Sequence, residues 1–384
     1  MNRSHSRILT THCGSLPRPH DLLDLMKAKL QGAPHNPEVY DRRVRHAVAD
    51  IVHKQVECGI DIPTDGEQGK HGFFAYVSER LTGFEPRPSA RYPRFAAEME
   101  AFPEYYEQYM SQAMLGGSVA PIVPLVCTGP VTYCGAEAVR RDIENLKAAL
   151  ASVHAEDAFL PSIAPSGVGS NEYYASEEEY FHALGAAMRT EYQAIVDAGL
   201  ILQLDDPFLT ELFGRPEVTP QEKKKTAATW VDALNHAIRG IPEEKIRFHT
   251  CYGINEGPRI HDAPLGDVVE AMLGIHAGAY SFEAANPRHE HEYHLWEKVK
   301  LPQGKVIIPG VVTHASNIVE HPELIAERLV RYARLVGREN VIAGTDCGFS
   351  SQATYTPEIH PTVVWAKFQA MAEGARLASR QLWS

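Results

Sequence analysis

Short apolar runs of strand length alternate with longer amphipathic stretches along most of this 384-residue chain. The apolar runs cover residues 7–12, 59–66, 122–127, 158–165, 200–207, 246–251, 279–284, 305–312 and 341–348. This alternation is typical of parallel β/α units and predicts an α/β protein built as a (β/α)8 barrel. Eight strands leave one run over. We expect it to be 122–127, because the turn-rich sequence CTGPVTYCG follows closely.

The helical stretches carry recognisable start and stop signals. One begins at Pro37 and ends at Gly59, and a second has Ser176 and Glu179 in capping-box spacing and ends at Gly199. Residues 85–120 are rich in aromatic and acidic side chains and predict an insertion or lid. Because no linker or internal repeat divides the sequence, we expect a single catalytic domain over residues 1–384.

Charge and composition exclude some classes of partner. The net charge is -12, and no face dense in lysine and arginine is visible, which argues against nucleic-acid binding. The first residues do not resemble a signal peptide, and no run approaches the roughly 18 apolar residues that a membrane span needs. We therefore expect a cytoplasmic protein with six reduced cysteines, free to bind metal. Assembly into a homo-oligomer stays open.

Polar side chains collect where the predicted strands end. They are Asp65, Glu67, Asp205, Asp206, His249, Cys251, Glu283, His314, Asp346 and Cys347. Any one of them could simply cap the following helix. In a β/α barrel, however, the carboxyl ends of the strands build the active site, so their joint placement predicts a site.

His249 and Cys251 are two positions apart on one predicted strand, so both side chains point to the same face. Zinc binds imidazole, thiolate and carboxylate groups in a tetrahedral array. Glu283 and Cys347, each at the end of a later strand, would complete such a set. The sequence therefore indicates a Zn²⁺ site.

Two other interpretations of these residues remain open. Cys251 and Cys347 are also compatible with small buried apolar positions, and His249 with a hydrogen-bonded core histidine. The segment NPRHEHEYH, with His289, His291 and His294, is a competing metal candidate. Cys347 lies in the turn sequence GTDCG rather than in an apolar run, which favours the first site.

Seven short motifs occur in the order found in the catalytic barrel of cobalamin-independent methionine synthase, which this chain resembles. The motifs are TTHCGSLPRP, DGEQ, QLDDP, HTCYG, SFEAAN, PGVVTHAS and GTDCG. The same superfamily contains uroporphyrinogen decarboxylase and the coenzyme M alkyltransferases. The resemblance implies a β/α barrel whose zinc ion activates a thiol for alkylation.

The resemblance also implies roles for individual residues. The zinc ligands would be His249, Cys251, Glu283 and Cys347, with Glu283 loosened when the thiol arrives. Ser15 would lie beside the thiol substrate. Glu67 and Asp205 would bind the amino group of homocysteine, and His314 would give a proton to the departing methyl carrier. These assignments suit the chemistry, because zinc deprotonates a thiol and two carboxylates can surround an ammonium group.

The expected activity is a zinc-dependent methyl transfer from methyltetrahydrofolate or another methyl carrier to homocysteine or a related thiol. If the donor carries a pterin, Tyr173 or Tyr174 would stack on it. An alternative is an epoxide-opening transferase of the coenzyme M type, whose sulfonate would need a cation such as Arg18 or Lys70. A third is a metal-free decarboxylase of the uroporphyrinogen type, although its many substrate carboxylates call for arginines and the strand ends here are acidic.

Overall fold

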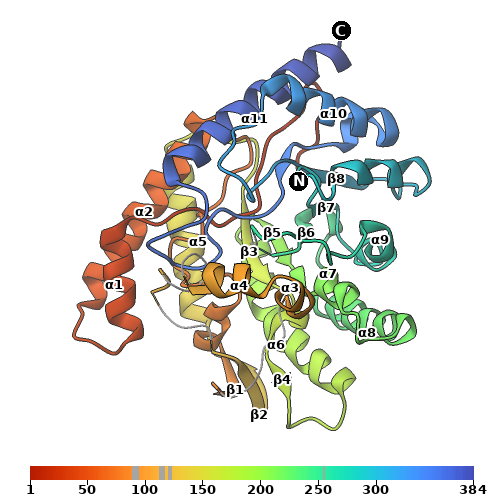
Figure 1. Ribbon diagram of the computed structural model, residues 1–384. Helices are drawn as coiled ribbons and strands as arrows, with labels where there is room; N and C mark the ends of the chain where they lie inside the picture. The colour runs from red at the N-terminus through yellow and green to blue at the C-terminus, as the bar shows by residue number, and fades with distance from the viewer. Residues whose placement is uncertain (89–94, 112–116, 120–122, 254–255) are drawn as a thin grey trace.

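A curved parallel sheet lies at the centre of the computed structural model, which describes residues 1–88, 95–111, 117–119, 123–253 and 256–384. Its strands are hydrogen-bonded in the order β3 (Phe159–Ile163), β5 (Ile201–Asp205), β6 (Ile246–Thr250), β7 (Ala279–Phe282), β8 (Val306–Val312) and β9 (Gly344–Thr345). Each neighbouring pair is parallel. All of them therefore end at the same edge of the sheet, as Figure 1 shows for the central strands.

Two shorter segments join the first strand of this sheet to the last. Thr10 forms a parallel bridge with Ala343, and Thr11 forms one with Ile62. The amide of Phe159 then donates to the carbonyl of Pro63 at 3.2 Å. Within the described residues, eight parallel segments thus close into a ring, and the predicted barrel is confirmed.

The ninth apolar run lies outside the barrel, as predicted. β2 (Leu125–Tyr133) pairs antiparallel with β1 (Leu81–Pro86) and parallel with β4 (Ser170–Asn171), in a separate small sheet. Residues 120–122, which include the start of that run, lie outside the described part of the chain. The pairing of β1 with β2 needs a glycine at position 83. The φ of Gly83 is 90°, and a Cβ atom added there would lie 2.6 Å from the carbonyl oxygen of Pro130.

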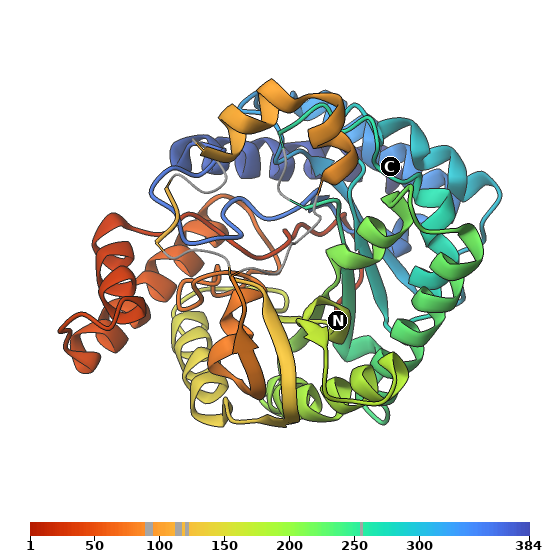
Figure 2. The ribbon, with the colours of Figure 1, turned by 60° about the horizontal axis from the view of Figure 1, so that its bottom comes forward.

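Helices surround the strands, as Figure 2 shows. They are α1 (His20–Leu30), α2 (Pro37–Glu57), α3 (Ala96–Ala101), α4 (Pro103–Tyr109), α5 (Ala136–Leu150), α6 (Glu177–Asp197), α7 (Pro207–Gly214), α8 (Pro220–Ala237), α9 (Leu265–Leu273), α10 (Pro322–Val336) and α11 (Pro361–Leu382). Over the described residues, none is both long and apolar enough to cross a membrane.

The helix boundaries follow the signals in the sequence. Asn36 caps α2 by accepting hydrogen bonds from the amides of its first turn, and Pro37 is the first helical residue. The hydroxyl of Ser176 accepts from the amide of Glu179 at 3.1 Å at the start of α6. Gly199, directly after α6, has a φ of 87°, a conformation that glycine adopts without strain. The predicted starts and stops of these helices are confirmed.

Helices α3 and α4 lie in the segment predicted to be an insertion or lid, and they dock on the chain that follows β6. The buried carboxylate of Glu98 in α3 accepts from the amides of Arg259 at 3.1 Å and His261 at 2.8 Å. The hydroxyl of Tyr105 in α4 donates to the carbonyl of Glu256 at 3.0 Å. The insertion therefore fixes the backbone of the segment around Arg259.

Apolar side chains fill one end of the barrel and leave the other to polar groups. The inner cluster comprises Leu9, Ile62, Phe159, Ile201, Ala279, Val306, Ile308 and Ile342. Every one of them precedes the strand-end residues on its own segment. A larger cluster packs the outer face of the strands against the helices. The apolar packing thus supports the edge at which the strands end.

A buried ion pair ties the antiparallel pair of β1 and β2 to the barrel wall. Arg80, directly before β1, donates to Glu191 of α6 at 2.9 Å and to Asp142 of α5 at 2.5 Å. Glu191 also accepts from Tyr133 of β2 at 2.7 Å and from Ser162 of β3 at 2.7 Å. Burial alone would raise the pKa of Glu191, but Arg80 and these hydroxyls hold it at about 2.

Replacing Glu191 by alanine should destabilise the fold strongly, because Arg80 would keep its burial and lose its main partner. We expect a loss of about 3 kcal/mol or more in the free energy of unfolding, measured by urea denaturation. Glu137→Ala is the matched control, since Glu137 forms an exposed pair with Arg140 and its loss should leave the urea midpoint unchanged. Equal midpoints for the two variants would contradict this role of Glu191.

Candidate metal and substrate site

Strand β6 directs alternate side chains into the barrel. Arg247 and His249 are fully buried in it, and Cys251 follows directly after its last residue. The Nδ1 atom of His249 lies 3.0 Å from the hydroxyl of Ser281 on β7. Nε2 of the same ring is buried and has no hydrogen-bond partner. Because a buried nitrogen without a partner is costly, Nε2 is available as a ligand atom.

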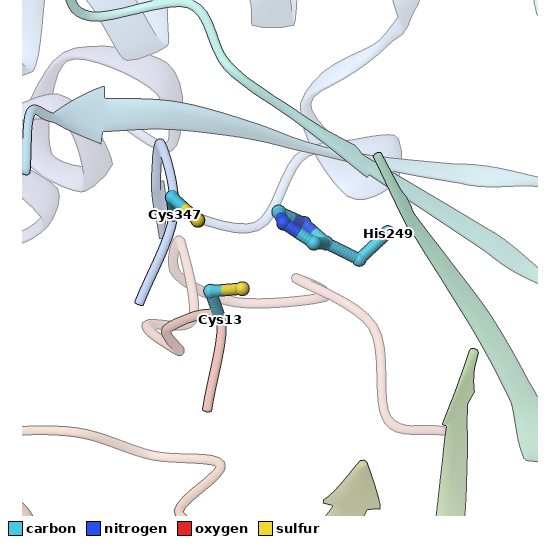
Figure 3. A group of neighbouring side chains, drawn as sticks. All are labelled: Cys13, His249 and Cys347. Carbon is cyan, nitrogen blue, oxygen red and sulfur yellow. The ribbon is translucent and has the colours of Figure 1, made fainter. Parts of the chain in front are cut away.

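Two thiols point toward this imidazole, as Figure 3 shows. A nitrogen of His249 and the sulfur atoms of Cys13 and Cys347 all lie within 4.8 Å of one another, and all three residues are buried. The sulfur of Cys251 is 3.2 Å from that of Cys347. Among the described residues, this is the one place where three or more potential metal ligands come together.

The donor set suits zinc. Tetrahedral zinc with sulfur about 2.3 Å away places its ligand sulfurs about 3.8 Å apart, and it takes thiolate and imidazole ligands together. Burial raises the pKa of the Cys13 thiol to about 12, so without a cation the thiol stays protonated. A divalent cation would stabilise the thiolate form.

Glu283, expected as the fourth zinc ligand, lies just after β7 in a buried ion pair. Its carboxylate accepts from the guanidinium of Arg259 at 2.6 Å and 3.4 Å. Burial raises the pKa of Glu283 to about 7, despite the nearby arginine. Arg259 also donates to Asp262 at 2.8 Å. In this conformation, Glu283 is therefore bound to arginine and not part of the thiol and imidazole group.

His314, expected as a proton donor, contacts the same carboxylate. Its Nδ1 atom is 3.4 Å from Oε1 of Glu283, and both side chains are buried. Burial, together with Arg259, holds the pKa of His314 well below its usual value. The imidazole is consequently neutral at pH 7 in this state.

Glu67 and Asp205 lie on the side of the cluster occupied by Cys13. A Cβ added to Gly14 would be 3.0 Å from a carboxylate oxygen of Glu67. The other oxygen of Glu67 is buried without a hydrogen-bond partner. Burial raises the pKa of Glu67 to about 7 and that of Asp205 to about 6. Glu67 also has a φ of 55°, a left-handed conformation that is strained for a glutamate.

Gln203, which the sequence interpretation did not single out, links these groups. Its side-chain amide donates to the carbonyl of Cys13 and, at 2.7 Å, to the carboxylate of Asp205. Cys13 itself was also missed. Its signal was its place at the end of the first barrel segment, the criterion that selected the other strand-end residues.

Ser15, Arg18 and Lys70, which the sequence offered for substrate contacts, instead contact the backbone of neighbouring segments. Ser15 packs against Gly348, the neighbour of Cys347, and accepts from the amide of Phe349 through its carbonyl. Arg18 is buried and donates to the carbonyls of Glu67, Lys70 and Ser350. Lys70 donates to the carbonyl of Pro161 at 2.5 Å. Arg18 therefore holds loops together, and Lys70 ties its loop to β3.

The remaining strand-end carboxylates stabilise turns. Asp346 accepts from the amides of Ala284, Ala285 and Asn286, which fixes the chain after Glu283. Asp206 caps α7. The side chain of Asp65 accepts from the amide of Glu67 at 2.9 Å. For these residues, helix capping and turn stabilisation account for the contacts observed.

The competing histidine cluster is paired with carboxylates. His289 contacts Asp262 at 3.0 Å and Glu292 at 2.9 Å. Burial lowers the pKa of His289, but these carboxylates outweigh it and raise the pKa to about 9. His294 lies 2.7 Å from Glu297 near the surface. Within the described residues, the histidines of this segment form no group of three potential ligands.

Comparisons with known proteins agree with the fold and identify a family. The sequence pattern of the family described as "Cobalamin-independent synthase, Catalytic domain" matches residues 170–366. A protein of Sulfolobus acidocaldarius named "Methionine synthase" is 24% identical over 344 residues, 88% of this chain and 85% of its own length. A protein of the same name from Pyrococcus furiosus is 27% identical over 348 residues, with the same coverage.

A solved structure shares the fold. The B12-independent methionine synthase from Shewanella sp. W3-18-1, in complex with selenomethionine, superimposes with a TM-score of 0.72 and 20% identity. The match covers 98% of this chain and 99% of that one. The family pattern spans slightly more than half of the 384 residues, and its range contains the segments that carry Asp205, His249, Cys251, Glu283, His314 and Cys347. The chain belongs to the family of cobalamin-independent synthase catalytic domains.

Proposed function

We propose that this protein transfers a methyl group from methyltetrahydrofolate or another methyl carrier to the thiol of homocysteine or a related amino-acid thiol, with zinc as its metal. One observation carries the proposal. A buried group of imidazole and thiol donors lies beside two carboxylates that have no cationic ion-pair partner among the described residues. The first group suits a metal that activates thiols, and the second suits the ammonium group of an amino acid.

His249, Cys251 and Cys347 would hold the zinc ion. The hydroxyl of Ser281 occupies Nδ1 of His249 and thereby directs Nε2 to the thiols. Zinc, when bound, keeps a ligated thiol deprotonated and nucleophilic at neutral pH. Three protein ligands leave a fourth position for an exchangeable group, which is the usual arrangement of a catalytic zinc site.

Glu67 and Asp205 would bind the ammonium group of the acceptor. Both are buried, and burial raises both pKa values. An ammonium group placed between them would favour their ionised forms and satisfy the unpaired oxygen of Glu67. Gln203, which bonds both Asp205 and the backbone of Cys13, would set the distance between the amino group and the metal.

The Glu283–His314 pair would handle the proton of the reaction. The acceptor sulfur forms a bond to the methyl carbon, the bond from that carbon to the carrier nitrogen breaks, and the nitrogen takes up a proton. Glu283, with a pKa of about 7, is 3.4 Å from Nδ1 of His314, a nitrogen without a hydrogen-bond partner, so a closer approach of the two side chains would let the carboxyl group give its proton to the imidazole. His314 would pass that proton to the carrier.

Tyr173 is the more exposed of the two tyrosines, and its exposure favours it for contact with a flat donor. Its side chain is 51% exposed. The hydroxyl of Tyr174 instead accepts from the amide of Val131, which ties it to β2. Tyr173 would therefore stack on the pterin, while Tyr174 holds β2 in place.

The alternative activities find less support. A sulfonate substrate of the coenzyme M type needs a cation, but Arg18 and Lys70 are bonded to backbone carbonyls. A porphyrinogen decarboxylase needs several arginines for its substrate carboxylates, whereas Glu67 and Asp205 make this part of the barrel acidic. Neither alternative uses the thiol and imidazole group together with the carboxylate pair.

The proposal is tested by a matrix of acceptors and donors. Purified protein should form methionine from homocysteine with methyltetrahydrofolate, its polyglutamate form or methylcobalamin, as followed by mass spectrometry. The reaction of coenzyme M with a small epoxide tests the alternative activity. Product from that pair alone would overturn the proposal.

Zinc should be present in stoichiometric amount and should depend on the two cysteines. We expect Cys251→Ser combined with Cys347→Ser to lose most of the metal, measured by elemental analysis after gel filtration, because two of three ligands are removed. Cys134→Ser is the control, since Cys134 is exposed. Zinc retained by the double variant would place the metal elsewhere.

Replacing Glu67 by glutamine should weaken binding of the amino-acid acceptor. We expect the KM for homocysteine to rise about 10- to 100-fold, the size of a lost charge-assisted hydrogen bond, with zinc content unchanged. A thiol that lacks the amino group should be used equally by the variant and the unaltered protein. Asp206→Asn serves as the control, because Asp206 caps α7. An unchanged KM for homocysteine would remove Glu67 from the binding site.

A further inference from the structure

The thiol of Cys13 has no task in the mechanism above, although it lies among the metal-binding residues. Its sulfur is within 4.8 Å of a ligand nitrogen of His249 and of the sulfur of Cys347. Cys13, Cys251 and Cys347 pack together as one buried cluster. We propose that Cys13 is the fourth zinc ligand when no substrate thiol is bound, so that the resting site has one histidine and three cysteines. This inference rests on the proposed function, because it takes zinc to be the resident metal.

The backbone around Cys13 is held so that its thiol stays at the cluster. The amide of Cys13 donates to the hydroxyl of Thr345 at 3.1 Å, and its carbonyl accepts from Gln203. Arg247 holds the preceding residues, since it donates to the hydroxyl of Thr11 at 2.9 Å and to the carbonyl of His12 at 2.5 Å. Three separate strands therefore fix the position of Cys13.

Glu283, the ligand that the family resemblance implies, is held away by other partners. Both of its oxygens accept from Arg259, which is also buried. The backbone of Arg259 is in turn fixed by Glu98 of α3. For Glu283 to bind the metal, this ion pair would have to break and leave a buried arginine with less compensation.

A ligand set with Cys13 in place of Glu283 has the same total charge. Two thiolates with one carboxylate, or three thiolates, each add three negative charges around a dication. Zinc accepts both sets, but thiolate is the softer ligand and the one already within reach of the cluster. Cys13 also lies toward Glu67 and Asp205, so a thiol whose ammonium group binds there would meet the metal at the position of Cys13.

Cobalt substitution tests the number of thiolate ligands without relying on activity. The protein is loaded with Co²⁺, and the intensity of the sulfur-to-cobalt charge-transfer band is measured. We expect Cys13→Ser to lower this band by about one third, as three thiolates become two. Glu283→Gln should leave the band unchanged, as should Cys134→Ser, which removes an exposed cysteine. A band that is unaltered in Cys13→Ser and altered in Glu283→Gln would overturn the inference.

X-ray absorption at the zinc edge of the unaltered protein gives an independent measurement that no folding defect can disturb. Three sulfurs and one nitrogen around zinc support the ligand set with Cys13, and two sulfurs contradict it. Protein without stoichiometric zinc would count against the proposed function, whereas zinc with two sulfur neighbours would count only against Cys13.

Discussion

The site depends on the alternation of side chains along β6, which sends Arg247, His249 and Cys251 into the barrel as one column. The lowest member, Arg247, is wholly buried, and its guanidinium lies 3.7 Å from the ring centre of Phe159. Its hydrogen bonds to Thr11 and His12 tie the first barrel segment to β6. The same column, which carries the proposed metal ligands His249 and Cys251, thus positions Cys13 from the N-terminal segment.

Charge compensation organises the space around this column. The cation of Arg259 is paired with Glu283 and Asp262, and its backbone is held by Glu98 of the insertion. On the opposite side, Glu67 and Asp205 form no ion pair with a cation among the described residues, and burial raises both pKa values. The barrel therefore has one compensated and one uncompensated group of carboxylates. In the proposed function, a positively charged substrate would bind at the second group, while the first group is paired with Arg259.

The sequence predicted the barrel, its excursion and the helix ends, because these follow from apolar periodicity and local capping chemistry. It also placed His249, Cys251 and Cys347 at strand ends, which is where the structure has them. It could not show the pairing of Glu283 with Arg259, since Arg259 lies in an irregular segment whose position depends on α3. Cys13, by contrast, directly follows the apolar run 7–12, so the strand-end criterion that selected the other residues would also have found it.

In the proposed function, the acceptor thiol reaches zinc in the column built by β6. X-ray absorption at the zinc edge with selenohomocysteine, the selenium analogue of the acceptor, tests this claim most directly, because selenium scatters differently from the cysteine sulfurs. We expect about one selenium neighbour of zinc when the analogue is bound, the number that one open position allows. Binding of the analogue with no selenium in the zinc coordination sphere would contradict it.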